Sequence, residues 1–307
     1  MIEVPMPTTS FPFALVDVFS EEPLTGNPLA VVWEADCLSV ERMRGIAREF
    51  NQSETTFVLR PGAQGAADRR LRSFTPTGAE VVGAGHNALG AWWLLAATNQ
   101  LGLAEGSATL RQEIGERVLP LQIEVKEGAP SAIRMSQASP VFGEILDDLA
   151  ELTSALGLKP GDLDTSLPTQ VVSTGAGHLM VPARNSVAVD SAEPDAPRLR
   201  QVLQKIGGQG CYLFSLDPVA PGSLAYTRFF NPTVGIWEDP ATGSAAGPLA
   251  CHLAARGVVA ESAEVVIEQG RSMGRSSLIT VHIGAEQVHI AGTCVVTAEG
   301  QLRVPTP

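Results

Sequence analysis

Hydrophobic positions in the first half of the chain predict short strands around two helices. Apolar residues recur at helical spacing from Ser39 to Phe50, and Ser39 stands where an N-cap is expected. A second helix, from Gly85 to about Thr98, is apolar on nearly every side, which is typical of a helix enclosed by sheet. Strands are expected at four apolar or β-branched runs: 13–19, 29–33, 55–60 and 70–75. The pattern predicts an α+β domain with a central apolar helix.

The second half repeats this order of elements. The stretch RSFTPT from Arg72 resembles RFFNPT from Arg228. With two residues inserted in the second copy, GHNA from Gly85 meets GSAA from Gly243. Gly243 opens a second apolar helix, which Gly257 ends. The other elements expected here are strands at 169–173, 179–181, 210–215 and 224–230, a helix at 198–206, and antiparallel strands between 264 and 304. This gapped internal repeat predicts two similar halves.

The length of the chain favours two domains. A single core rarely grows to 307 residues. We expect an N-terminal αβ domain over residues 1–117 and a C-terminal αβ domain over residues 118–293. A strand near 294–307 is expected to be able to return to the first domain.

Composition and charge narrow the classes of partner. With 44% hydrophobic and 18% charged residues, this is an ordinary globular sequence. Its net charge of -12 disfavours nucleic acid and anionic membranes, because both select a basic surface. A small anionic substrate stays compatible with that charge, provided that helix N-termini or a few arginines supply local donors.

The cysteines and the N-terminus favour a cytoplasmic protein. Four widely separated cysteines predict reduced, buried thiols: Cys37, Cys211, Cys251 and Cys294. The start MIEVPMPTTS lacks the basic and apolar regions of a signal peptide. The apolar run from Leu89 to Ala97 is too short to span a bilayer, so no membrane partner is expected.

The loop before the first apolar helix fits the dinucleotide fingerprint G-x-G-x-x-G/A. Gly83, Gly85 and Ala88 occupy its fixed positions, and Glu105 lies near the distance expected of a ribose-binding acid. However, the loop follows several strands rather than the first strand of a βαβ unit. Its near-copy PATGSAAG in the second half lacks the fingerprint. A nucleotide-dependent oxidoreductase therefore remains an alternative rather than the favoured interpretation.

Two other uses of the glycine loops remain. The glycines could only allow a helix to start close to a strand. They could also present two helix N-termini to one site, where free N–H groups and the helix dipole favour a carboxylate by about 0.3–2 kcal/mol each. Two such ends would hold a small acid without a metal or a nucleotide. We favour this last interpretation.

Four separated motifs carry a family resemblance over most of the chain, in the right order. They are FALVDVFSEEPLTGNPLAVV, FNQSETTFVL, FTPTGAEVVGAGHNALGA and NPTVGIWEDPATGSAAGPLACHL. They resemble the PhzF-type isomerases, named for phenazine biosynthesis. The resemblance implies a diaminopimelate epimerase-like fold: two similar domains, each a curled mixed or antiparallel sheet around a central apolar helix, with the active site in the cleft between them. It also implies a homodimer.

The resemblance assigns roles to particular residues. The glutamate of N-x-S-E-T-T-F, the proton-transferring acid/base of the family, falls on Glu54, and the histidine of the first helix-opening G-H falls on His86. The aspartate and serine of E-D-P-A-T-G-S-A fall on Asp239 and Ser244. The two helix starts add the substrate-binding candidates Gly85, Asn87 and Gly243. In the family these groups isomerise trans-2,3-dihydro-3-hydroxyanthranilate without a cofactor. The usual G-H-P is here Gly85-His86-Asn87, a departure that affects local substrate contacts more than the chemistry.

A hydrogen can move between two carbons on one face if a single base removes and returns it. A carboxylate does both when its pKa is raised from about 4.3 toward about 6–7 by apolar surroundings. Glu54 precedes the β-branched, apolar run Thr55-Thr56-Phe57-Val58, so such surroundings are expected.

Each candidate also has a purely structural explanation. Glu54 could be a surface residue at a strand end, and His86 a helix-cap histidine. Asp239 could form the turn before Pro240, or orient His86 or bind an amino group, while Ser244 could only cap its helix. Glu80 and Glu238 lie near the same helix starts without an assignable role.

Neighbouring chemistries fit less well. The remaining histidines have no metal-ligand spacing, so no metal is expected. Two-thiol racemisation is excluded because the helix starts carry His86 and Ser244, while Cys251 lies two turns further along its helix. The sequence therefore predicts a cofactor-independent isomerase acting on a small carboxylate-bearing substrate. The alternatives are the oxidoreductase above and a non-catalytic protein that binds small acids.

Overall fold

The computed structural model describes residues 8–62, 65–284 and 287–305. Residues 1–7, on which most of the signal-peptide argument rests, lie outside the described residues. The chain divides into two compact units. Unit 1 contains the chain up to Leu24, Pro28–Ile133 and the segment from Thr293 onward, and unit 2 contains Thr25–Asn27 and Arg134–Gly292.

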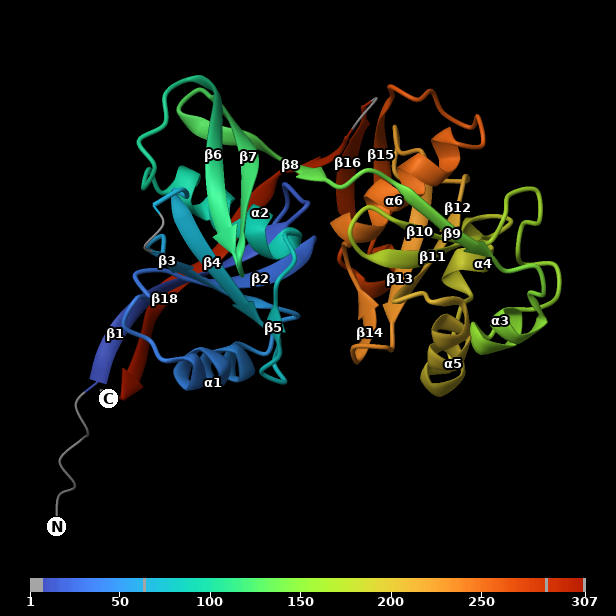
Figure 1. Ribbon diagram of the computed structural model, residues 1–307, viewed down its shortest axis with the longest axis horizontal. Helices are drawn as coiled ribbons and strands as arrows, with labels where there is room; N and C mark the ends of the chain where they lie inside the picture. Colours follow the sequence, from blue (N-terminus) through green and yellow to red (C-terminus); the bar gives the residue numbers. More distant parts are fainter. Residues whose placement is uncertain (1–7, 63–64, 285–286, 306–307) are drawn as a thin grey trace, which may run out of the picture. The chain divides into compact units, whose positions relative to one another are not determined.

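Unit 1 is a mixed sheet with two helices (Figure 1). Strand β2 runs parallel to β3, β3 antiparallel to β4, β4 parallel to β6, and β6 antiparallel to β7. The short β5 forms an antiparallel hairpin with β4. The elements are β1 (Thr8–Val18), β2 (Asn27–Val32), α1 (Val40–Phe50), β3 (Thr55–Leu59), β4 (Arg69–Phe74), β5 (Glu80–Val81), α2 (His86–Ala97), β6 (Gly106–Ile114), β7 (Arg117–Lys126), β8 (Ala129–Gln137, which continues into unit 2) and β18 (Cys294–Pro305).

Unit 2 repeats the same order of pairings. Strand β11 runs parallel to β12, β12 antiparallel to β13, β13 parallel to β15, and β15 antiparallel to β16. The short β14 forms an antiparallel hairpin with β13. The elements are β9 (Val141–Ile145), α3 (Ala150–Ala155), β10 (Gln170–Ser173), β11 (Gly177–Pro182), α4 (Ser186–Asp190), α5 (Ala196–Ile206), β12 (Gly210–Ser215), β13 (Ala225–Asn231), β14 (Ile236–Asp239), α6 (Gly243–Ala254), β15 (Glu264–Gln269), the 3-10 turn η1 (Arg271–Met273), β16 (Ser277–Ile283) and β17 (Val288–Gly292).

The unit boundary differs from the one expected after residue 117. Strand β7 pairs with β6 along its whole length, from Ile114 opposite Arg117 to Gly106 opposite Val125. That hairpin keeps both strands in unit 1 and moves the boundary to Ile133 and Arg134. The last strand, β18, pairs antiparallel with β1 in unit 1.

The two apolar helices are buried over most of their length. Helix α2 is buried continuously from His86 to Leu95 and contacts β1, β3 and β18. A side chain at Gly90 would place its Cβ 2.7 Å from atoms of Leu29 and Val18, so this helix and its strands approach too closely for anything but glycine. Helix α6 contacts β10, β11, β16 and β17, and a Cβ at Gly247 would overlap Gln137.

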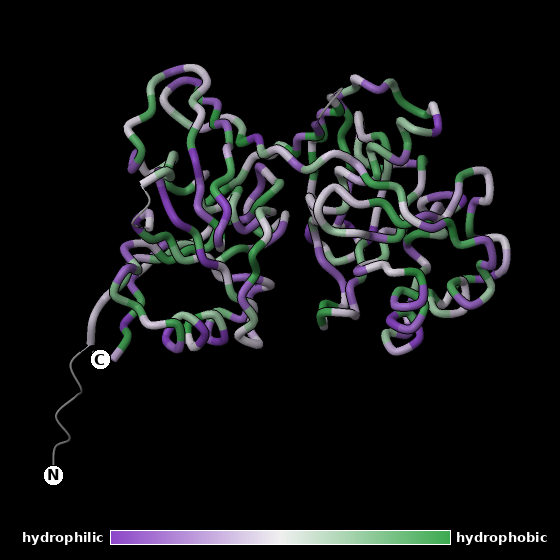
Figure 2. Tube along the Cα trace, viewed as in Figure 1, coloured by the Kyte–Doolittle hydropathy of each residue, from purple (hydrophilic) through white to green (hydrophobic). Residues whose placement is uncertain are grey.

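Helix α1 lies where its periodicity predicts and turns the chain toward the candidate site. Ser39 accepts a hydrogen bond from the backbone N–H of Arg42, which confirms it as the N-cap. The buried face consists of Met43, Ile46 and Ala47, and Figure 2 shows the mixture of hydrophilic and hydrophobic residues along this helix. Asn51 ends it in the left-handed conformation, three residues before Glu54.

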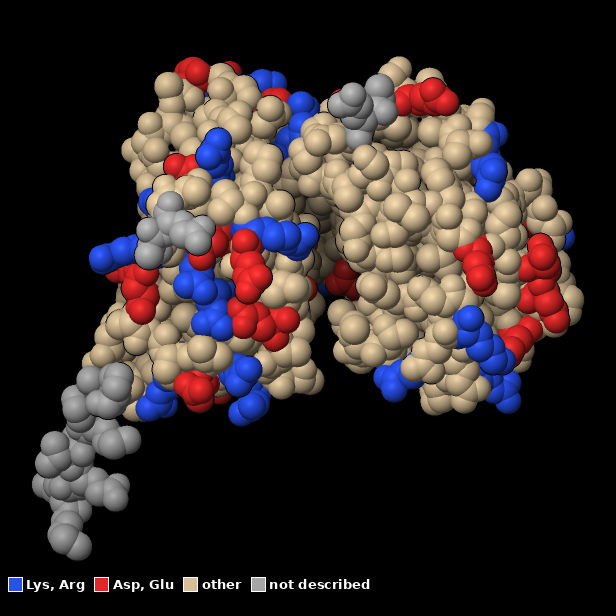
Figure 3. All heavy atoms as spheres, viewed as in Figure 1, with Lys and Arg blue, Asp and Glu red and all other residues tan. Residues whose placement is uncertain are grey.

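The surface carries both signs of charge, and most of the cysteines are buried as predicted. Acidic and basic side chains are interspersed on the face drawn in Figure 3. None of the helices within the described ranges is long and apolar enough to cross a membrane. The four cysteines are free thiols, and three are buried. The expectation of four buried thiols is wrong for Cys37, which is exposed because it lies in a turn before α1 rather than in the core.

Candidate active site

Glu54 lies at the junction between helix α1 and strand β3. Its side chain is half-buried, and the strand that follows, Thr55–Leu59, is buried throughout. The segment has no freedom to slide because β3 is fixed between β2 and β4. A carboxylate at this point therefore has a defined position at the margin of an apolar strand.

His86 is the first residue of helix α2 and contacts the loop that carries Glu54. Its Nε2 lies 3.4 Å from the Oγ of Ser53, the residue before Glu54. Burial lowers the pKa of His86 to about 4, so the imidazole is neutral at neutral pH. A neutral imidazole can donate or accept one hydrogen bond at each nitrogen, but it supplies no positive charge. The alternative explanation, a helix-cap histidine, does not describe its side chain, because α2 has no side-chain cap hydrogen bond.

Asn87 uses its side-chain amide to hold the glycine loop. Its Oδ1 accepts from the backbone N–H of Gly85 at 2.8 Å. Its Nδ2 donates to the carbonyl oxygen of Gly83 and to Ser73 Oγ, both at 3.0 Å. The residue is only 2% exposed. The amide group is therefore engaged by the loop and by strand β4, which fixes where helix α2 begins.

The loop does not have the surroundings of a dinucleotide site. It follows the antiparallel β4–β5 hairpin instead of the first strand of a βαβ unit. The N–H of Gly85 points to Asn87 instead of toward a ligand. A Cβ at Gly83 would meet nothing within 4 Å, so this glycine is not demanded by a close approach of protein backbone.

Asp239 ends strand β14 in unit 2 as a buried carboxyl group. Asn27 Nδ2 donates to its Oδ1 at 2.9 Å, and Thr242 Oγ1 donates to its Oδ2. Burial raises the pKa of Asp239 to about 6, against these two hydrogen bonds, which lower it. Gln269 Nε2 donates to the backbone oxygen of Asp239 and to Thr242 Oγ1. The network fixes the turn between β14 and α6.

Ser244 is the second residue of helix α6 and does not cap it. The N-cap position belongs to Thr242, whose hydroxyl is directed to Asp239 and not to the helix. Ser244 Oγ instead lies 3.4 Å from Nε2 of His178, a residue at the start of strand β11. His178 is 3% exposed, and burial lowers its pKa to about 4. The sequence did not predict a role for His178, because only the fold brings it close to the start of helix α6.

Glu80 and Glu238 have a structural role. Each forms a two-point ion pair with an arginine on the neighbouring strand: Arg72 with Glu80 at 2.7 Å for both contacts, and Arg228 with Glu238 at 2.8 and 2.9 Å. These pairs tie together the hairpins that precede helices α2 and α6. Their positions confirm the internal repeat around Arg72 and Arg228.

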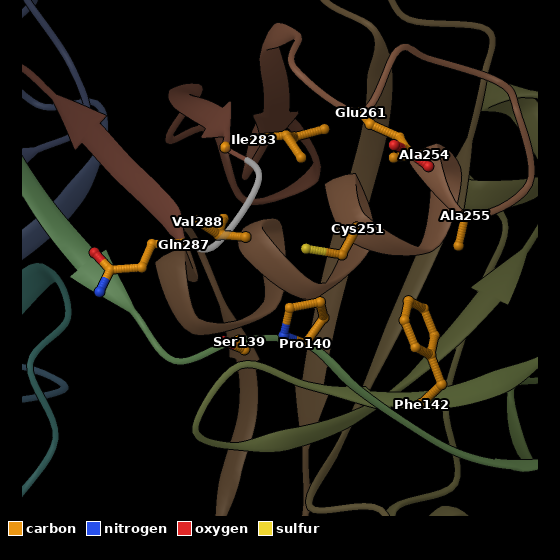
Figure 4. A pocket seen from close by; sticks show the side chains of 11 residues that line it. Ser139, Pro140, Phe142, Cys251, Ala254, Ala255, Glu261, Ile283, Gln287 and Val288 are labelled. Atoms are coloured by element: carbon orange, nitrogen blue, oxygen red, sulfur yellow. The ribbon is translucent and has the colours of Figure 1, made fainter.

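A pocket of unit 2 lies elsewhere on helix α6. It has a volume of about 670 Å³ and is lined by Cys251, Ala254 and Ala255, near the C-terminal end of the helix (Figure 4). Cys251 is seven residues past Ser244, about 10 Å along the helix. Burial raises the pKa of its thiol to about 11, so it is a protonated core residue. Two-thiol chemistry finds no support at either helix start.

The chain is similar in sequence to one protein family over most of its length. It matches the family described as phenazine biosynthesis-like protein, PhzC-PhzF, over residues 16–300. It is 35% identical over 294 residues to the trans-2,3-dihydro-3-hydroxyanthranilate isomerase of Pseudomonas aeruginosa, covering 94% of this chain and 98% of that protein. It is also 35% identical over 291 residues to the uncharacterized isomerase YddE of Escherichia coli, covering 92% of this chain and 94% of that protein.

A solved structure agrees with these sequence matches. The phenazine biosynthesis protein of the PhzF family from Bacillus anthracis superposes with a TM-score of 0.86 at 31% identity, covering 96% of this chain and 99% of that one. The α+β mixed-sheet fold is thus a PhzF-type fold. The chain belongs to the phenazine biosynthesis-like PhzC-PhzF family, and it is an isomerase.

Proposed function

We propose that this isomerase moves a proton between two carbons of a small carboxylate-bearing substrate without a cofactor. The compound named for the Pseudomonas aeruginosa relative, trans-2,3-dihydro-3-hydroxyanthranilate, is the first candidate. The observation that carries the proposal is the start of helix α2, where Ser53, next to Glu54, contacts a buried neutral His86. An acid/base beside a hydrogen-bonding imidazole suits proton transfer.

Glu54 is the proposed base and then the acid. Its carboxylate takes a proton from a substrate carbon, the electron pair spreads over the conjugated system, and the carboxylic acid returns a proton at a second carbon. No net proton is consumed, so no co-reactant is needed. His86 holds a polar substituent of the substrate through a neutral hydrogen bond, because its depressed pKa keeps it uncharged.

The start of helix α6 is proposed to bind the substrate carboxylate. The N–H groups of a first helical turn favour an anion, and Gly243 and Ser244 provide the first two positions of this helix. Asp239 is proposed as the partner of an amino group or of a shared proton, because its raised pKa lets it exist in both forms near neutral pH. Gly85 is proposed to line the substrate site through its Cα, because its N–H is held by Asn87. Asn87, whose amide is engaged in the loop, is proposed to position that backbone and not to touch substrate.

The same proposal covers the domain architecture, the location and the oligomeric state of the protein. Units 1 and 2 would be the two domains of a diaminopimelate epimerase-like fold, each with its sheet curled around its central helix. Groups at each helix start would act on the substrate. The protein would be a cytoplasmic homodimer. The repeated order of strand pairings in the two units supports the duplicated architecture.

The test is proton NMR in D₂O of trans-2,3-dihydro-3-hydroxyanthranilate with the intact protein. We expect conversion to an isomer with deuterium entering the newly protonated carbon, because a carboxylic acid exchanges with solvent. Added NADH or NADPH should change neither rate nor product. If that compound is untouched, the same exchange should appear with another small unsaturated acid, as the equal likeness to YddE allows. Exchange with no acid in such a screen would overturn the proposal.

A further inference from the structure

The contact between Ser244 and His178 has a direction that the histidine's surroundings determine. His178 Nε2 faces Ser244 Oγ at 3.4 Å. Its Nδ1 is buried and has no hydrogen-bond partner among the described residues. A Cβ at residue 210 would lie 3.1 Å from that Nδ1, so Gly210 brings no side chain to the nitrogen it adjoins. The ring of Phe229 packs edge-on to the imidazole at 4.9 Å between centroids and holds it in place.

Only one tautomer suits this environment. The low pKa of His178 means that one ring nitrogen carries a hydrogen and the other does not. A buried N–H without a partner is rarer and costlier than a buried lone pair without one. The hydrogen therefore belongs on Nε2, and Nε2–H donates to Ser244 Oγ.

We infer that His178 is a positioning residue that fixes Ser244 as a hydrogen-bond donor. Because Ser244 Oγ accepts from His178, its own hydrogen is free to point to an oxygen of the bound carboxylate. This rests on the proposed function of the α6 start. The opposite tautomer would make His178 accept from the serine, which would prepare a nucleophilic Ser–His pair. The buried Nδ1 argues against that arrangement.

The first test needs no substrate. Protein labelled with ¹⁵N at histidine is examined by two-bond ¹H–¹⁵N correlation at pH 7, with His178→Gln identifying the His178 signals. We expect the Nε2–H tautomer, and we expect its Nε2 signal to shift in Ser244→Ala. An Nδ1–H tautomer or an imidazolium at pH 7 would overturn the inference. This result stands even if trans-2,3-dihydro-3-hydroxyanthranilate proves not to be the substrate.

The second test is a double-mutant cycle on KM with the acid that the intact protein turns over. Ser244→Ala and His178→Leu should each raise KM about tenfold with kcat changed less than about threefold, because a carboxylate anchor contributes to substrate and transition state alike. In the Ser244→Ala background, His178→Leu should add less than about twofold. His178→Gln, which keeps a donor near Nε2, should recover most of the loss.

A matched control separates positioning from packing. His252 resembles His178 in being buried, and burial lowers its pKa to about 4 as well. It lies on helix α6, at the opposite end of the helix from Ser244. His252→Gln should leave KM within about twofold of the unmodified protein. Additive losses for His178→Leu and Ser244→Ala, or an equal rise of KM in His252→Gln, would contradict a role exerted through Ser244.

Discussion

The starts of helices α2 and α6 carry the same pair of side chains in exchanged places. At α2 the histidine is on the helix and the serine comes from the loop between α1 and β3: His86 and Ser53. At α6 the serine is on the helix and the histidine comes from strand β11: Ser244 and His178. Both pairs are 3.4 Å apart. A repeated frame can therefore present an imidazole at one helix start and a hydroxyl at the other.

The hairpins before the two helices differ more than the helices do. In the strand pairing, Val81 faces Ser73 in unit 1, while Asp239 faces Phe229 at the matching place in unit 2. The charged pair is also deeper in unit 2. Side chains of Arg72 and Glu80 are 18% and 32% exposed, against 9% and 8% for Arg228 and Glu238. The ion pair of unit 2 is therefore less accessible to water than that of unit 1. We expect the stability of the protein to fall more when the pair in unit 2 is broken.

The largest expected effect separates the two ion pairs. Arg228→Met leaves Glu238 buried without its cation and removes donors from the carbonyl oxygens of Val189 and Ala192. We expect a loss of about 3–5 kcal/mol in the free energy of unfolding. Arg72→Met should cost about 1 kcal/mol, because solvent screens the more exposed pair. Urea unfolding of both variants measures the difference. Equal losses of unfolding free energy would show that the deeper burial of the Arg228–Glu238 pair does not matter for stability.

A smaller effect tests the buried carboxyl group at the end of strand β14, Asp239. The pKa of Asp239 is raised by burial from 3.8 to about 6, so the folded state holds this proton more tightly than the unfolded chain. The group's contribution to stability is therefore full below about pH 4 and falls as pH rises toward 7, by roughly 2–3 kcal/mol. Asp239→Asn should remove that dependence.

The measurement is the free energy of unfolding of both proteins between pH 4 and 7. The difference between Asp239→Asn and the unmodified protein should move in favour of the variant as pH rises. A difference that moves in favour of the unmodified protein would mean that hydrogen bonds from Asn27 and Thr242 outweigh burial. The carboxyl would then have a lowered pKa.

Local patterns in the sequence were sufficient for the main elements. The Ser39 cap with its periodic apolar positions predicted α1, and uninterrupted apolar runs predicted α2 and α6. The two-residue strand β5 left no signal, because such a strand is shorter than any periodicity. The unit boundary lies at Ile133 and Arg134 and not after residue 117, because β6 and β7 form one long hairpin that composition does not reveal.

The site was harder to predict where partners are distant in the chain. Asn27 meets Asp239 across 212 residues, and His178 meets Ser244 across 66. No spacing rule connects such residues; they meet through strand pairing, as when His178 faces Gly210. Glu80 and Glu238 gave no role from sequence, although the repeat already placed Arg72 and Arg228 at matching positions. Their pairing becomes evident once each arginine's strand is seen beside its glutamate.

The central claim is that Glu54, at the junction of α1 and β3, performs the proton transfer, while the start of α6 binds the substrate carboxylate. The most direct measurement is the initial rate of deuterium incorporation by Glu54→Gln, beside Glu49→Gln as an exposed control on helix α1. Loss of a positioned acid/base should lower the Glu54→Gln rate at least about 100-fold. Glu49→Gln should stay near the unmodified rate. Incorporation by Glu54→Gln at an undiminished rate would contradict the account and assign the proton transfer to another group.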